Sequence, residues 1–491
     1  MNQTPAPFDF HGKARAEMIR RGFQPDFPRQ VMAEVNAVKT PPAFAPGCLD
    51  LRNLLWSSID NNDSRDLDQI EWAEKRPDGA IRVLVGIADV DGMVKKGSAT
   101  DARASANATS VYTGGPVFSM LPERLSTDLT SLGPNEDRMA IVIETVVAAD
   151  GQVTCAEAEV ALVRNHAQLN YDSVGRWLRD GNGAPGEGVL PPGLNDQLLL
   201  QNEAAQRLQK FRKQHGSLTF GGVESIPIIV ANKITGFAMV RENAARDIIE
   251  SFMVAGNVAM ASYLRAKNSL CVRRIVRTPK RWDRILAIAA LLGTRLPAQP
   301  DPKALGDFLA AQKQDNPAHF PELSLAVLKS MGPGEYVVEH PGQEHEGHFG
   351  LAVSDYTHST APNRRYADLL MQRLLKASLA GMPAPYTEAE LTALAAHCTE
   401  RESAAQHVER FMKKVAAALL LGPQIGQLFD AIVTGVNTDG TYARLLTSPA
   451  EGRVIRGEKG LDVGNEIQVR LVSVDPNRGF IDLENVRRTV K

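Results

Sequence analysis

The sequence lacks the features of a secreted, disulfide-bonded or membrane-spanning protein. Its four cysteines, Cys48, Cys155, Cys271 and Cys398, each lie more than a hundred residues apart, so no pair has metal-binding or redox spacing. No apolar run approaches the roughly eighteen residues of a membrane span. The first ten residues lack the basic start and apolar block of a secretion signal. We therefore expect a cytoplasmic protein with no membrane segment.

An excess of positive charge is also missing, because the formal net charge is −2 over 491 residues. This excludes a surface coated with Lys and Arg, but it leaves room for an internal basic channel. Three basic runs exist, within residues 210–213, 273–281 and 410–414. Each run, taken alone, is also compatible with an ordinary solvated face. The length predicts more than one domain.

Residues 1–47 are expected to form a small helical domain. Ala14–Arg21 and Arg29–Val38 have helical composition, and Gly22 and the Pro25–Pro28 turn separate them. The Pro- and Gly-rich stretch 41–47 is typical of a linker. Two short helices across a tight turn could form a helix-turn-helix or a simple packing appendage, and the sequence leaves both open.

Residues 48–424 change from a strand pattern to a helical one. From Leu54 to about Leu162 apolar residues alternate or run together between Asp-Gly turns, which predicts strands. Beyond Tyr171 helices dominate, and we expect them over Asn243–Leu264, Trp282–Leu292, Tyr366–Leu379 and Glu388–Leu421. The predicted fold class is α+β, with one mixed domain over 48–424.

Residues 425–491 contain about five short strand patterns, with turns at Asp439-Gly440 and Pro476-Asn477. Five strands in so short a segment predict a small β-barrel of the OB type, a fold that commonly binds oligonucleotides. The order of glycines and strands resembles an S1 RNA-binding domain.

The segment 58–69 is unusually acidic. Asp66 and Asp68 are two residues apart and point the same way in an extended chain, and Asp60 can fold back through the Asn-rich turn. Converging carboxylates repel one another unless a cation neutralises them, and oxygen ligands select Mg²⁺ or Mn²⁺. A solvated Asx-rich turn is the alternative. A calcium-binding loop is disfavoured because Arg65 stands where the sharp turn requires glycine.

This segment resembles the acidic motif of the ribonuclease II / RNase R (RNB) family, in which Asp60, Asp66 and Asp68 match the first three aspartates. Gln69 departs from the pattern, because many members have a fourth aspartate there. Further blocks follow in the family's order: Ser110-Val111-Tyr112, Met120-Leu121-Pro122, Leu129-Thr130-Ser131-Leu132, Glu250 with Met253 and Asn257, His348-Phe349-Gly350-Leu351, and Tyr356 to Asp368.

The resemblance implies a processive 3′-to-5′ exoribonuclease that hydrolyses single-stranded RNA to nucleoside 5′-monophosphates in RNA decay and processing. It also implies an internal channel that threads the RNA to a buried metal site, with Mg²⁺ or its substitute Mn²⁺. We expect a monomer with no organic cofactor.

The family's residue roles carry over to matching positions. Asp60, Asp66, Asp68 and Gln69 are the expected metal ligands, and Asp66, Asp68 and Arg364 the expected catalytic residues. Tyr112 and Phe220 match the aromatic rings that stack on bases, and Tyr171 and Glu250 match the contacts to ribose. Arg365 is the alternative to Arg364 for binding phosphate, since both follow the same motif.

Two departures define the open questions. Well-known members carry two cold-shock barrels before the catalytic domain, and residues 1–47 are too few for even one. The loss of the fourth aspartate at Gln69 favours an alternative, an RNA-binding protein that kept the fold and lost catalysis.

Overall fold

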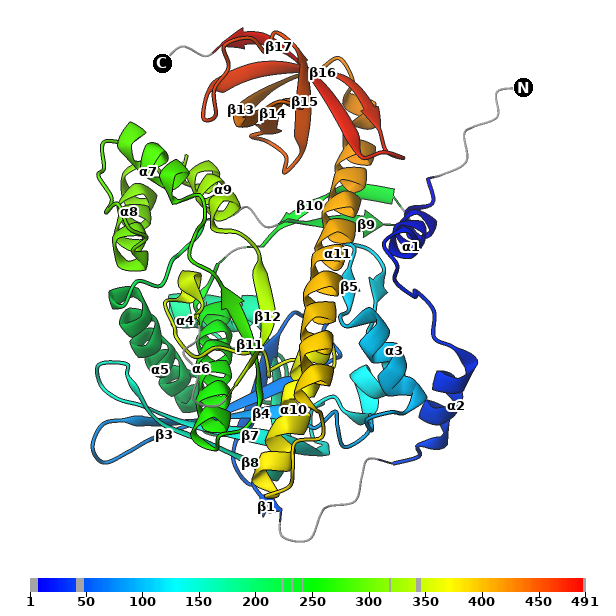
Figure 1. Ribbon diagram of the computed structural model, residues 1–491, viewed down its shortest axis with the longest axis vertical. Helices are drawn as coiled ribbons and strands as arrows, with labels where there is room; N and C mark the ends of the chain where they lie inside the picture. The colour runs from blue at the N-terminus through cyan, green and yellow to red at the C-terminus, as the bar shows by residue number, and fades with distance from the viewer. Residues whose placement is uncertain are drawn as a thin grey trace.

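The structure, a computed structural model, describes residues 8–40, 48–221, 225–230, 233–240, 242–317, 319–340 and 346–488. It consists of a mixed α+β body, a pair of N-terminal helices on its side and a β-barrel above it (Figure 1). The long helix α11 (Glu388–Leu421) runs along the body up to the barrel. The expected linker at 41–47 lies outside the described residues.

A six-stranded sheet in the order β1-β8-β2-β3-β4-β7 forms the base of the body, and β7 also pairs with β8. β8 serves three partners because it is 18 residues long: it pairs antiparallel with β7 and parallel with β1 and β2. The strands are β1 (Leu49–Asp50), β2 (Trp56–Asp60), β3 (Gln69–Lys75), β4 (Ile81–Ala88), β7 (Asp137–Val147) and β8 (Val153–Asn170).

Helices cover this sheet and form the main hydrophobic core with it. α6 packs on β7 and β8, and α5 packs on β3. Asn243 caps α6 by accepting hydrogen bonds from two backbone N–H groups, and Thr387 with Glu390 forms a capping box on α11. These helices are α4 (Tyr171–Asp180), α5 (Leu194–Gln214), α6 (Ala244–Ala266) and α10 (Tyr366–Leu379), beside α11.

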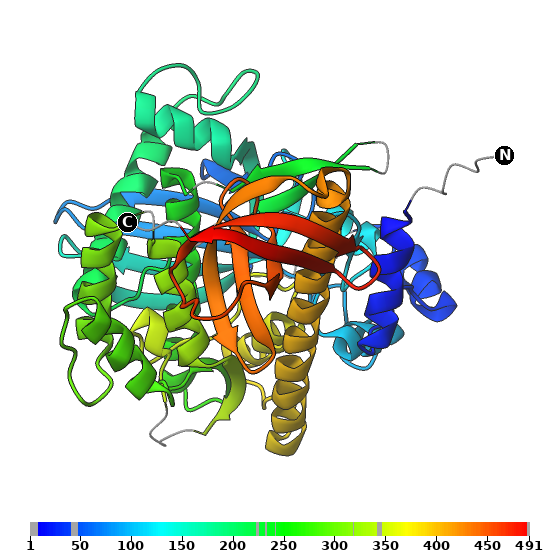
Figure 2. The ribbon, with the colours of Figure 1, turned by 90° about the horizontal axis from the view of Figure 1, so that it is seen from above.

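A second group of helices has its own hydrophobic core on one side of the body. It consists of α7 (Trp282–Leu291), α8 (Pro302–Asp315) and α9 (Phe320–Met331). Seen from above, the barrel lies over the middle of the body, between this helical group and α11 (Figure 2).

The region beyond Tyr171 also contains two strand pairs that the helical expectation did not include. They are β9 (Ser225–Val230) with β10 (Lys233–Met239), and β11 (Cys271–Val276) with β12 (Gly334–Glu339). Their β-branched composition is typical of strands. The strand-rich region in turn contains a helix, α3 (Ala99–Asn107), capped by Ser98. Shorter elements are β5 (Val111–Tyr112), β6 (Val117–Phe118), a π-helical turn Arg124–Leu129, and 3₁₀ turns Phe349–Leu351 and Gly422–Gln424.

The two N-terminal helices, α1 (Phe10–Arg20) and α2 (Arg29–Ala37), dock at different places on the body. α1 packs on α11 and α2 packs on α3. Phe10, Ala14 and Met18 of α1 share a hydrophobic cluster with Val111 and Val408. This arrangement favours the packing role that the sequence left open beside a helix-turn-helix.

The C-terminal segment folds into a closed barrel in the order β13-β14-β15-β17-β16, as the strand pattern predicts. The strands are β13 (Leu428–Asn437), β14 (Gly440–Leu445), β15 (Glu451–Arg456), β16 (Glu466–Asp475) and β17 (Phe480–Arg488). Ala417, Ala418 and Leu421 of α11 complete the barrel's core. Arg444 of the barrel pairs with the buried Glu322 of α9, so the barrel is fixed to the body at two places.

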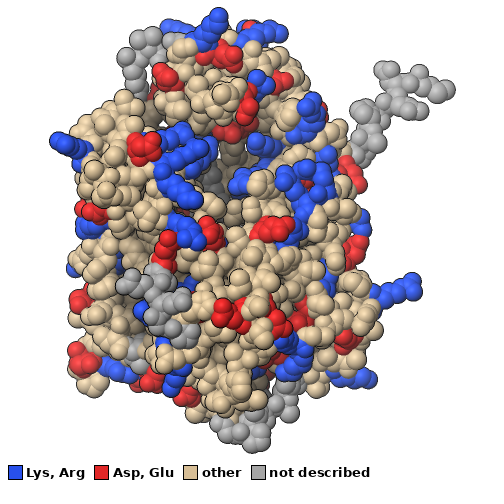
Figure 3. Space-filling model, in the orientation of Figure 1, with Lys and Arg blue, Asp and Glu red and all other residues tan. Residues whose placement is uncertain are grey.

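Lys and Arg side chains gather on both sides of the hollow that separates the barrel from the body (Figure 3). Not all residues of the three basic runs lie at this hollow. Arg273 is fully buried and pairs with Glu339 and Asp355 at 2.6 and 2.9 Å, and Arg274 pairs with Glu402. The run at 273–281 therefore contributes internal ion pairs as well as surface charge. Among the described residues, no helix is long and apolar enough to cross a bilayer.

Candidate functional site

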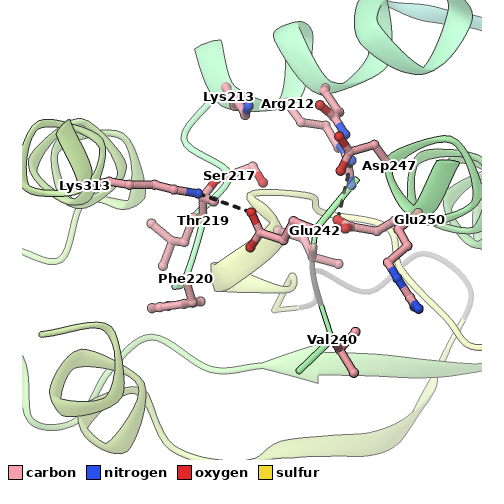
Figure 4. A pocket seen from close by; sticks show the side chains of 14 residues that line it. Arg212, Lys213, Ser217, Thr219, Phe220, Val240, Glu242, Asp247, Glu250 and Lys313 are labelled. Atoms are coloured by element: carbon pink, nitrogen blue, oxygen red, sulfur yellow. Dashed lines mark hydrogen bonds and ion pairs between the residues drawn. The ribbon is translucent and has the colours of Figure 1, made fainter. Parts of the chain in front are cut away.

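The expected site residues come together in the middle of the body. One cavity of about 550 Å³ is lined by nine of them: Asp60, Asp66, Asp68, Gln69, Tyr112, Tyr171, Glu250, Arg364 and Arg365. Phe220 lies apart from this group, in a neighbouring cavity of about 470 Å³ (Figure 4). Arg246 and Glu250 line both cavities, so the two spaces share a wall.

The aspartate loop between β2 and β3 is held in place from several sides. Asp60 ends β2, and its carboxylate accepts a hydrogen bond from Ser64 Oγ at 2.8 Å. Ser131 Oγ donates to the carbonyl oxygen of Arg65 and accepts from the backbone N–H of Leu67, at 2.8 and 3.1 Å. Leu67 is buried in the main core. The loop is therefore anchored between its aspartates, which leaves their carboxylates to face the cavity.

The strand register brings Tyr171 beside the aspartates. β2 and β8 run parallel with Asp60 opposite Asn170, and Tyr171 follows Asn170 as the first residue of α4. Asn170 caps this helix through a hydrogen bond from the backbone N–H of Ser173. Two segments more than a hundred residues apart in sequence thus supply adjacent side chains to one cavity.

The arginine motif meets the aspartate loop directly. The backbone N–H of Asn363 donates to Asp68 Oδ1 at 3.1 Å, and Arg364 Nε lies 3.8 Å from Asp68 Oδ2. Arg365 instead makes a two-pronged contact with Asp368, at 2.7 and 2.8 Å. Because Asp368 engages the Arg365 guanidinium, Arg364 is the better placed of the two to receive a phosphate.

The Tyr112 segment is tied to the same motif. The backbone N–H of Ser110 donates to the carbonyl oxygen of Arg364 at 2.9 Å, and Glu409 of α11 accepts from the N–H of Tyr112 at 3.0 Å. Tyr112 is 41% exposed as a whole residue, and it lines the cavity, where its ring can stack on a base.

Burial controls the charge of the aspartates. Burial raises the pKa of Asp68 to about 7, while nearby Arg364 lowers it and Asp66 raises it further. Burial also raises the pKa of Asp66, and Asp60 adds to this effect by repulsion. Burial thus favours the neutral form of these carboxyl groups, and positive charge brought to them favours the ionised form.

The residues present fit a divalent cation in the kind of ligand that they offer. Asp60, Asp66, Asp68 and Gln69 provide hard oxygen atoms, which suit Mg²⁺ or Mn²⁺. Within the described part of the chain, no three His, Cys, Asp or Glu side chains form a ready-made metal cluster. Mg²⁺ commonly uses one or two carboxylates and completes its shell with water and substrate phosphate, so the donor set remains sufficient.

Several residues of the site were not assigned roles from the sequence. Arg246 and His358 line the cavity. His358 is held by Tyr336, whose hydroxyl lies 2.7 Å from its Nδ1. His358 belongs to the Tyr356–Asp368 motif, which was a usable signal, whereas no local pattern singles out Arg246.

Glu71 is a further surprise because a charged residue in a strand is normally expected to face water. It is fully buried, and neither carboxylate oxygen has a hydrogen-bond partner among the described residues. Burial raises its pKa well above the usual value, and Asp60 adds to the shift. Burial therefore favours the neutral form of Glu71 over its carboxylate.

Comparison with known proteins agrees with this geometry. Residues 49–381 match the RNB domain, and residues 427–486 match the RNase II-type exonuclease C-terminal S1 domain. Ribonuclease R 1 of Lactococcus lactis subsp. lactis (strain IL1403) is 29% identical over 94% of this chain. The chain covers only 59% of that relative's length.

Solved structures match the fold over almost the whole chain. Mycoplasma genitalium RNase R, in complex with ribose-methylated single-stranded RNA, matches with a TM-score of 0.88 at 22% identity, over 97% of this chain and 78% of that one. Yeast Ssd1, described as a pseudonuclease, matches with a TM-score of 0.72 at 16% identity, over 96% of this chain and 58% of that one. Likeness at these identities concerns the fold alone.

The matched ranges fall inside the predicted domains 48–424 and 425–491, whose exact limits stay predictions, as does the limit of 1–47. The RNB match covers more than half of the chain, and it includes the aspartate loop and the arginine motif. The chain therefore belongs to the RNB family of ribonuclease II and RNase R, and it carries an RNase II-type C-terminal S1 domain.

Proposed function

We propose that this protein is a metal-dependent 3′-to-5′ exoribonuclease that hydrolyses single-stranded RNA processively to nucleoside 5′-monophosphates. One observation carries the proposal: Asp60, Asp66, Asp68 and Arg364 line a single cavity, although Arg364 lies roughly three hundred positions after the aspartates in the sequence. Three carboxylates facing an arginine suit phosphodiester hydrolysis, which needs charge neutralisation around the phosphoryl group. The names of the relatives support the same activity.

The ligands proposed for Mg²⁺, or Mn²⁺ in its place, are Asp60, Asp66, Asp68 and the side-chain carbonyl of Gln69. Divalent ions held by these residues would supply an activated water and would stabilise charge on the attacking and leaving oxygens. Arg364 binds the scissile phosphate, because its guanidinium offers permanent charge and two parallel hydrogen bonds. The 3′ oxygen leaves, so each released nucleotide keeps its 5′ phosphate.

The remaining residues hold the RNA end. Tyr112 stacks on the terminal base and Phe220 on a base further along, contacts that every base can make. Glu250 and Tyr171 bind ribose, and a carboxylate that accepts a hydrogen bond from the 2′-hydroxyl favours RNA over DNA. The two cavities adjoin at Arg246 and Glu250, which line both of them, and we assign them to successive nucleotides of the RNA end.

The alternative is an RNA-binding pseudonuclease. It is favoured by Gln69, which replaces a family aspartate, and by the likeness to yeast Ssd1. The cavity argues against it, because Asp60, Asp66, Asp68 and Arg364 are all retained, whereas an abandoned site has no reason to keep buried carboxylates whose pKa values are raised.

The decisive experiment incubates the protein with 5′-labelled and 3′-labelled single-stranded RNA, with Mg²⁺ and separately with Mn²⁺. We expect the 3′ label to be released at once as a nucleoside 5′-monophosphate, and the 5′-labelled strand to shorten stepwise. A DNA strand of the same sequence is the control. RNA that is bound but stays intact in both metals would establish the pseudonuclease instead. The cytoplasmic location and the monomeric state stay predictions.

A further inference from the structure

Arg246 stands in the wall between the two cavities, one helical turn before Glu250 on α6. Both residues line both spaces, so a strand that extends from the aspartates toward Phe220 passes over them. Figure 4 shows the second cavity, where Glu250 lies toward Arg212 and Phe220 lies on the opposite side. The closest contact between Arg212 and Glu250 is 3.8 Å. Glu250 thus lies near Arg212 and forms no ion pair with Arg246 among the described residues.

The Arg246 guanidinium is held in place by neutral groups. It lies over the Tyr171 ring, 4.2 Å from the ring centre, and its Nη2 is 3.4 Å from Asn61 Oδ1. Stacking on an aromatic face fixes the plane of the guanidinium without neutralising its charge. Its buried Nε has no hydrogen-bond acceptor among the described residues.

The other arginines of this region show how unusual this is. Arg265, at the opposite end of α6, pairs with Asp355 at 3.1 Å, and Arg273 pairs with Glu339 and Asp355. Arg246 has no carboxylate within ion-pair distance in the part of the chain that the structure describes. A partly buried guanidinium in a cavity wall normally has an anionic partner, because burial without one is costly.

Helix stability gives no reason for a cation at this position. Arg246 lies in the first turn of α6, and the cap residue Asn243 accepts hydrogen bonds from the N–H groups of Ala245 and Arg246. The positive end of the helix dipole disfavours a cation there and favours an anion. The dipole and the guanidinium therefore reinforce one another as a site of positive potential in the cavity wall.

We propose that Arg246 binds a backbone phosphate of the RNA, on the 5′ side of the phosphate that Arg364 receives, where the strand passes from one cavity to the other. This inference rests on the proposed function. The contact is independent of base identity, as degradation of any sequence requires. Tyr171, which supports the guanidinium, then serves the ribose on one side and the phosphate contact on the other.

The test maps this contact along the RNA with neutral linkages. Binding is measured in EDTA, so that no turnover occurs, with oligomers that carry a single methylphosphonate at successive positions from the 3′ end. For the unaltered protein, we expect affinity to fall about tenfold at the linkage that Arg246 contacts, since a charge-assisted hydrogen bond is lost. In Arg246→Gln, binding to normal RNA should be about tenfold weaker, and sensitivity to that one linkage should disappear.

Arg265→Gln is the matched control, because it removes an arginine from the same helix outside both cavities. It should retain the full pattern of methylphosphonate sensitivity. The salt dependence provides a second readout: the slope of log affinity against log salt should fall by about 0.7 for Arg246→Gln, as one phosphate contact to a single strand is lost. The control should keep the slope of the unaltered protein.

The outcomes separate the two proposals. If the unaltered protein degrades RNA from the 3′ end and Arg246→Gln keeps every sensitivity and the salt slope, the role of Arg246 is overturned and the enzyme proposal stands. If the unaltered protein binds RNA, shows the Arg246-dependent linkage and does not cleave, the contact stands and the enzyme proposal fails. A protein that binds no single-stranded RNA overturns both.

Discussion

The cavity with the three aspartates is lined by residues from segments that are far apart in sequence, from Asp60 to Arg365. The barrel, in contrast, is built from strands that follow one another within sixty-one residues, Leu428 to Arg488. The charges also differ. Asp68 is 2% exposed and 3.8 Å from its nearest cation, while barrel pairs such as Arg470–Glu484 lie at the surface.

This difference separates two contributions to the proposed function. Buried, incompletely paired charges are costly to fold and suit chemistry, because they act on the transition state. Surface charges on a rigid barrel add little stability and suit binding to a polyanion. Changes at the aspartates and Arg364 should therefore alter turnover, and changes in the barrel should alter affinity.

Asp68→Asn is the strongest test of this separation, and we expect it to abolish hydrolysis while RNA binding stays near its original level. Asn is nearly isosteric, so the hydrogen bond from Asn363 N–H can persist. The lost negative charge is the one that would hold a cation at the attacked phosphate. Filter binding in EDTA and cleavage rates in Mg²⁺ and Mn²⁺ measure the two effects separately. Activity above about a tenth of the original in both metals would remove Asp68 from catalysis.

Arg364→Lys should lower turnover about a hundredfold and change affinity little, because the charge remains and the two-pronged geometry is lost. Single-turnover cleavage and equilibrium binding are the paired measurements. Arg365→Lys is an instructive companion: Arg365 is bound to Asp368, so its replacement should lower the thermal unfolding midpoint instead. Equal effects of the two changes on turnover at unchanged stability would contradict this assignment.

The same contrast explains how much could be predicted from the sequence. The bounds of α10 and α11 and the five-strand barrel follow from local periodicity and turns, and the structure confirms them. The gathering of the aspartates with Arg364 was expected only through resemblance to a family, because no local pattern joins residues three hundred positions apart. β9 and β10 were missed because a short hairpin interrupts a largely helical region.

The proposed role of Arg246 and the burial of Glu71 could not be predicted from the sequence for a related reason. The role of Arg246 depends on the Tyr171 ring and on the lack of a nearby carboxylate, both set by tertiary structure. A Glu within a strand is ordinarily placed on the solvent side, yet Glu71 is fully buried in β3, the strand on which α5 packs. Burial of a charged residue becomes visible only when the covering helix is in place.

Removal of residues 425–491 tests the other half of the comparison. We expect RNA affinity to fall at least about tenfold and processivity to drop, while cleavage of a short oligomer remains measurable, because every proposed metal ligand lies in the body. Circular dichroism and thermal unfolding must first show that the body stays folded, since Leu421 and its neighbours on α11 lose their cover. A folded truncation with no activity on short RNA would refute the division of labour.

The pH dependence of metal binding should report mainly on Asp68. Burial raises the pKa of this carboxyl to about 7, so it is mostly protonated at pH 6 and mostly ionised at pH 8. A cation binds the ionised form and displaces the proton, so affinity should rise about tenfold between these pH values. Calorimetric titration with Mn²⁺ measures it. The Asp68→Asn protein should show a flatter profile, and an equally steep one would assign the proton to another group.

Tyr112→Ala should have the smallest effect, a longer final oligomer with little change in the initial rate on long RNA. Tyr112 lines the cavity and is 41% exposed. Stacking is worth roughly 1–3 kcal/mol per base, a contribution that matters most when few other contacts remain. Long RNA keeps its contacts to the channel and barrel, so the loss of stacking has little effect on its initial rate.

Tyr112→Phe is the matched control, because it keeps the aromatic face and removes only the hydroxyl. Gel analysis should therefore show final oligomers of the same length for the unaltered protein and Tyr112→Phe. The final oligomer of Tyr112→Ala should be longer by at least one nucleotide. Identical limit products for all three would place the terminal base elsewhere, whereas a lengthened product for Tyr112→Phe would make the hydroxyl, and not the ring, the contact to the RNA end.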